Sequence, residues 1–105
     1  MNVILVHEYY TEEHLAEVAD QMKSLGAPKI KAVWVEAYGA WVALEGCHRL
    51  RAAQALGLTP IIDAIEYDED RRLDDPALDL DHQDDWTVGK ICDRAHAETM
   101  LQFAD

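Results

Sequence analysis

The stretch Val42-Ala43-Leu44-Glu45-Gly46-Cys47-His48-Arg49-Leu50-Arg51-Ala52-Ala53-Gln54-Ala55-Leu56-Gly57 changes its hydrophobic pattern at Gly46. Before this glycine the chain is apolar and typical of a buried strand, and after it leucine and alanine recur at helical spacing. A glycine at position 57 is well placed to end that helix. The sequence therefore predicts a strand that passes through a glycine turn into a short helix.

The turn itself carries the residues of an anion site. The first N–H groups of a helix have no partner within the helix and lie at the positive end of its dipole, and Gly46 lets a phosphate approach them closely. Arg49 can add a bidentate fork and His48 one further donor, while Cys47 would lie in a field that favours a reactive thiolate. The same spacing also fits a structural interpretation, in which Cys47 is a small buried hydrophobe, His48 a capping donor and Arg49 a surface charge.

A second helix is predicted upstream, between Thr11 and Gly26. Thr11 is a typical N-cap, two glutamates follow it where the helix dipole favours negative charge, and Gly26 is a typical terminator. The apolar positions at helical spacing are Leu15, Val18, Ala19, Met22 and Leu25.

Four segments are predicted to be strands because apolar, β-branched and aromatic residues are concentrated in them. They cover residues 3–6, 30–36, 40–45 and 61–65. Residues 37–39 fit the loop of a hairpin. With the two helices these strands give the order β-α-β-β-α-β, and we expect an α+β fold with a small mixed β-sheet.

The last 40 residues predict an acidic loop over residues 67–86, with a helical turn around Ala77 and Leu78, and then a closing helix from Thr87 to about Phe103. Apolar positions on one face of that helix are Val88, Ile91, Cys92, Ala95 and Phe103. We expect residues 87–105 to pack on the 1–66 core or on a second copy of the chain, so a homodimer is one expected assembly of this single domain.

Length and composition fit a small protein of the cytoplasm. The 105 residues suffice for one core, and no run approaches the roughly 18 apolar residues of a membrane span. The apolar start has no basic segment before it and no small-residue cleavage site, so it predicts a strand and not a signal peptide. The two cysteines show no pairing pattern, which suits a reducing compartment.

The net charge of −12 is unevenly placed. Residues 1–65 carry 8 acidic and 5 basic side chains, whereas residues 66–105 carry 13 and 4. Such a chain would be repelled by nucleic-acid phosphates, so direct DNA binding is not expected. A short anion could still be held at a turn, because backbone N–H groups and one arginine act over short range.

Residues 42–57 resemble the signature of the ParB/sulfiredoxin superfamily, whose members place a Gly-x-His/Arg-Arg turn between a strand and an alanine-rich helix. Residues 15–17 followed by Gly26-Ala27-Pro28 resemble the helix and turn that precede it, and the resemblance covers about residues 3–66. It implies a nucleotide site, for ATP or another nucleotide with Mg²⁺, formed by Glu45, Gly46, His48 and Arg49.

The unbroken Gly46-Cys47-His48-Arg49 is similar to the motif of sulfiredoxins. In that branch ATP phosphorylates a peroxiredoxin's sulfinic acid and the cysteine then attacks sulfur, which implies Cys47 as the catalytic nucleophile of an ATP-dependent reductase or phosphotransferase. Sulfiredoxins have a second glycine where this chain has Glu45. Their first helix also supplies a lysine and hydroxyl groups, and the nearest residues here are His14, Glu17 and Gln21.

The acidic-glycine pair Glu45-Gly46 and residues 50–53 instead resemble ParB-like domains. In partition proteins this turn binds cytidine triphosphate with Mg²⁺ and a helix-turn-helix domain follows, for which the 40 acidic residues here leave no room. This branch implies a non-catalytic nucleotide-binding or adaptor module that acts through a protein partner. The two branches stay open as alternatives.

Metal sites are weaker hypotheses. Cys92 and His96 stand four residues apart on the predicted closing helix and could present two ligands with His82, but a core thiol and a surface histidine fit the spacing better. The aspartates and glutamates of residues 68–85 lack the spacing of a calcium loop and predict a solvated face. We therefore predict no metal site in the protein itself.

The three tryptophans could form a stacking platform, but we interpret them structurally. Trp34 and Trp41 lie in paired strands, where large aromatic side chains are usually core, and Trp86 could anchor the last helix or an interface.

Overall fold

Three helices and five strands form in the part of the chain that the computed structural model describes, residues 1–6, 10–80, 86–95 and 100–104. Two short 3-10 turns, η1 and η2, complete the set. In chain order the elements are β1 (Asn2–Ile4), α1 (Glu12–Leu25), β2 (Lys29–Val35), η1 (Glu36–Tyr38), β3 (Ala40–Ala43), α2 (Cys47–Leu56), β4 (Ile61–Ala64), η2 (Pro76–Leu78), α3 (Val88–Arg94) and β5 (Met100–Gln102). The predicted order β-α-β-β-α-β is confirmed over the first 64 residues.

The five strands form one mixed sheet in the order β4-β2-β3-β1-β5. β2 and β3 pair antiparallel as the predicted hairpin, whereas β1 runs parallel to β3 and β2 parallel to β4. Each parallel pair is separated in the chain by at least one helix, as such a connection requires. The chain is thus an α+β protein.

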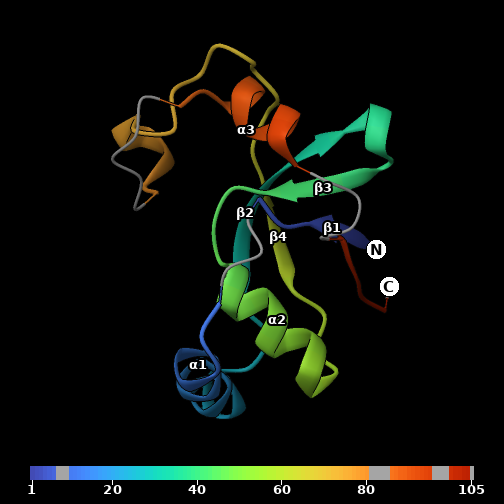
Figure 1. Ribbon diagram of the computed structural model, residues 1–105, viewed down its shortest axis with the longest axis vertical. Coiled ribbons are helices and arrows are strands. Elements are labelled where there is room, and N and C mark those ends of the chain that lie inside the picture. Colours follow the sequence, from blue (N-terminus) through green and yellow to red (C-terminus); the bar gives the residue numbers. More distant parts are fainter. Residues whose placement is uncertain (7–9, 81–85, 96–99, 105) are drawn as a thin grey trace.

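The sheet lies between two helical layers, because successive strand residues point to opposite faces. Val3 and Leu5 of the first segment belong to the core beneath α1 and α2, together with Leu50. Ile4 belongs to a second core with Val88 of α3. Figure 1 shows α1 and α2 together on one side of the sheet and α3 on the other.

The first two helices begin and end where the sequence predicts. The Thr11 hydroxyl accepts a hydrogen bond from the backbone N–H of His14 at 3.3 Å, and the Gly26 N–H donates to the carbonyl of Met22 at 2.8 Å. Gly57 ends α2 with φ 71°, in the left-handed region that glycine adopts readily. No described helix is long and apolar enough to cross a membrane.

The predicted closing helix over residues 87–103 is wrong. α3 ends at Arg94, Ala95 is extended, and residues 100–102 form β5, which pairs antiparallel with β1. Backbone hydrogen bonds of 2.9 Å join Met1 and Phe103 in both directions. Leu101 and Phe103 contact the α1–α2 core while Met100 contacts the other, so their true period is two. Strand pairing overrides the helix propensity of this segment.

Two further expectations are corrected. Trp34 is 45% exposed and not core, although its ring makes an edge-to-face contact with the partly buried Trp41 at 5.5 Å. The acidic loop is more than a solvated face, since Leu73 and Leu78 are fully buried. The helical turn expected near Ala77 and Leu78 is present as η2.

Candidate functional site

Gly46 forms the sharp turn between β3 and α2 that the sequence predicts. Its φ of +79° lies in the left-handed region, and its carbonyl accepts the hydrogen bond from Leu50 that opens the helix. A Cβ at this position would lie 2.5 Å from Cδ1 of the buried Ile30 and 3.3 Å from Nη2 of Arg49. The guanidinium therefore lies directly against the turn, where only glycine leaves room.

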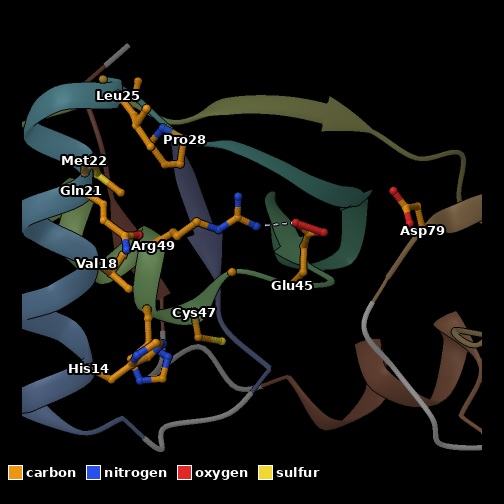
Figure 2. Close-up of a pocket in the computed structure, with 14 residues that line it drawn as sticks. His14, Val18, Gln21, Met22, Leu25, Pro28, Glu45, Cys47, Arg49 and Asp79 are labelled. Carbon is orange, nitrogen blue, oxygen red and sulfur yellow. Dashed lines mark hydrogen bonds and ion pairs between the residues drawn. The ribbon is translucent and has the colours of Figure 1, made fainter.

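A pocket of about 600 Å³ lies beside this turn (Figure 2). It contains all five residues predicted for the site: Glu45, Gly46, Cys47, His48 and Arg49. Helix α1 and the turn after it supply much of the remaining wall. Those residues are His14, Val18, Gln21, Met22, Leu25, Gly26, Ala27 and Pro28. The pocket thus has a polar part at the glycine turn and a largely apolar part along α1.

Arg49 lies between these two parts and is held by the protein itself. Its Nη2 lies 2.5 Å from Oε1 of Glu45, and its Nη1 donates to the Lys29 carbonyl at 3.3 Å. The arginine side chain is 41% exposed and that of Glu45 22%. Figure 2 shows the guanidinium extending from α2 towards Glu45, with the α1 side chains Val18, Gln21 and Met22 on the other side.

Two histidines extend the polar part towards the start of α1. The rings of His14 and His48 meet edge to face, with centroids 4.4 Å apart. Nδ1 of His14 also lies 3.7 Å from a carboxylate oxygen of Glu17. His14 and Gln21 were no part of the predicted site. The signal that could have found them is the helical face that runs from residue 14 through 18 and 21 to 25.

The two cysteines differ in position and chemistry. Cys47 is the first residue of α2, is 5% exposed and lines the pocket. Cys92 lies in the core on the opposite face of the sheet, where burial and the nearby Asp93 carboxylate raise the pKa of its thiol to about 11. Of the two, Cys47 alone is placed for chemistry in the pocket.

Asp79 reaches the same pocket from the acidic segment, which the sequence treated only as a solvated face. The Lys31 ammonium donates to the Asp79 carbonyl at 3.2 Å, which fastens this segment to β2. Asp79 adopts φ 51°, an uncommon conformation for a residue other than glycine. In Figure 2 it lies on the same side of Arg49 as Glu45.

The metal hypotheses find no further support in the described residues. Among residues 1–6, 10–80, 86–95 and 100–104, no three histidine, cysteine or carboxylate side chains converge as metal ligands. Cys92 is a buried core thiol, as expected, whereas His82 and His96 lie outside the described residues.

Comparisons with protein-family models, with curated proteins and with solved structures found no match.

Proposed function

We propose that this protein is a ParB/sulfiredoxin-like domain that binds the phosphate groups of a nucleotide, ATP or a similar one, at the Gly46–Arg49 turn. The observation that carries the proposal is the convergence, in one pocket, of a glycine turn at a helix start, an arginine and two histidines. Each of these is a donor that phosphate oxygens accept.

The other half of the pocket suits the rest of such a ligand. Val18, Met22 and Leu25 offer apolar surface to a ring, and the amide of Gln21 offers both a donor and an acceptor beside it. Sites for cofactors are mostly apolar with a few placed polar groups, and about 600 Å³ falls within their usual size. Both features support a nucleotide over a bare inorganic anion.

Binding is tested by calorimetry and thermal unfolding with ATP, CTP and pyrophosphate, each with and without Mg²⁺. We expect at least one nucleotide to stabilise the wild type, and Arg49→Ala to lose about tenfold in affinity or more, since the lost hydrogen bonds are charge-assisted. Lys90→Ala is the matched control, because it removes one positive charge from α3 outside the pocket. Absence of stabilisation by every nucleotide would contradict the proposal.

An enzymatic form of this function would use Cys47 as the nucleophile. Its position in the pocket wall supports that role, since its thiol would lie beside a bound phosphate. Cys47→Ser should then keep nucleotide binding and lose ATP turnover with a sulfinic-acid protein substrate. Unchanged turnover in the variant would leave a non-catalytic nucleotide-binding or adaptor module that acts through a protein partner, as the alternative to the enzyme.

A further inference from the structure

The short ion pair between Glu45 and Arg49 occupies the donors that a bound phosphate would need. Nη2 of the guanidinium lies 2.5 Å from the carboxylate, and the same nitrogen lies against the Gly46 turn. A carboxylate and a phosphate both bind the planar fork of an arginine in the same way. The two anions therefore compete for one group.

We propose that Glu45 is an internal competitor for Arg49 that keeps the affinity of the pocket for simple anions low. The inference rests on the proposed phosphate-binding function and adds a specificity-determining residue to it. Before a phosphate takes both guanidinium nitrogens, the pair with Glu45 has to open. The apparent affinity of every ligand is then reduced by the fraction of molecules in which the pair is closed.

The charge of the pocket points the same way. Besides the two histidines, its charged lining consists of Arg49 against the two carboxylates of Glu45 and Asp79. A bare anion would meet two negative charges and one positive charge there, so attraction from the pocket as a whole is absent. A ligand that also contacts the apolar wall of α1 gains free energy elsewhere and can open the pair.

The expected consequence is a size threshold. Inorganic phosphate and pyrophosphate, which contact only the polar part of the pocket, should bind wild-type protein weakly. A nucleotide reaches the surface of Val18, Met22 and Leu25 and should bind measurably. Removal of the Glu45 charge should raise the affinity for all of these ligands by a similar factor.

The test compares wild type with Glu45→Gln, which keeps the size of the side chain and removes its charge. We expect pyrophosphate and ATP to bind the variant about five- to tenfold more tightly by calorimetry, a factor set by a partly exposed ion pair and the loss of one repulsive charge. Glu36→Gln, an exposed residue outside the pocket, is the matched control and should leave both affinities unchanged. In an Arg49→Ala background the gain should fall to the contribution of charge repulsion alone.

A second readout needs no bound ligand. Phenylglyoxal modifies arginine side chains, and peptide mass spectrometry can follow Arg49 alone. Opening of the ion pair should make Arg49 react severalfold faster in Glu45→Gln than in wild type or Glu36→Gln.

The outcomes separate the two proposals. Unchanged or weaker binding by Glu45→Gln, in a protein whose wild type binds ATP, overturns the competitor role and leaves the phosphate site standing. Lack of binding to every variant overturns the proposed function and the competitor role together. An Arg49 reaction rate that Glu45→Gln does not change also overturns the competitor role.

Discussion

At the scale of single residues, Gly46 is the position on which the site depends most. A substituted residue would carry both the strain of φ +79° and the contact with Ile30. We expect Gly46→Ala to lower the free energy of unfolding by about 2 kcal/mol. Gly57 is the matched control, since its φ is +71° but its Cβ would meet nothing within 4 Å. Gly57→Ala should cost about 1 kcal/mol, and equal losses in urea unfolding would contradict this account.

Cys92 makes stability depend on alkaline pH. Burial and Asp93 raise the pKa of its thiol from an ordinary 9.0 to about 11, so the folded state retains a proton that the unfolded chain loses. The stabilisation from the buried neutral thiol is complete below pH 9 and is lost as the pH rises from 9 to 11. Wild type should therefore lose more unfolding free energy across this range than Cys92→Ala. Parallel losses in urea titrations would exclude this role.

The residues of the site divide by how local their signals are. The Gly46–Arg49 turn was predictable because a glycine between a strand pattern and a helix pattern acts through backbone geometry alone. His14, Gln21 and Asp79 were not, because they enter the pocket only through the packing of α1 and of the acidic segment. The pair of Glu45 with Arg49 was within reach of the sequence, at a spacing of four residues.

At the scale of elements, prediction succeeded where caps mark the ends of helices and failed where pairing decides. Thr11, Gly26 and Gly57 bound α1 and α2 as expected. The segment that becomes β5 is composed of good helix formers, and its pairing with β1, almost 100 residues away in the chain, leaves no local trace.

The strand β5 should contribute to stability through Phe103, which follows it and packs in the α1–α2 core at 9% exposure. We expect Phe103→Ala to lower the free energy of unfolding by about 3 kcal/mol, because it leaves a cavity in that core. Gln102→Ala, on an exposed neighbour, should change it by less than about 0.5 kcal/mol. Similar small effects of both in chemical denaturation would argue against the packing of this segment.

At the scale of the whole molecule, two cores share one sheet. The core beneath α1 and α2 comes almost entirely from the first 58 residues and is completed by Leu101 and Phe103. The second core sets Ile4, Val33, Val42 and Leu44 of the sheet against residues that all lie beyond position 64. Those partners are Ile65, Leu73, Leu80, Trp86, Val88, Ile91, Cys92, Ala95 and Met100. The acidic third of the chain is thus a layer of the fold and not an appendage.

This arrangement predicts that residues 1–66, which resemble a complete core in sequence, do not fold alone. Without the last third, Val33, Val42 and Leu44 would be exposed on one face of the sheet, and β1 would lose its pairing with β5. Exposed apolar surface of this kind outweighs the remaining core of so short a chain. We expect the 1–66 fragment to show no cooperative thermal transition by circular dichroism and to bind the dye ANS, whereas the full chain unfolds cooperatively. A fragment with dispersed amide resonances and a sharp transition would contradict the two-core account and place the phosphate turn on a self-sufficient unit.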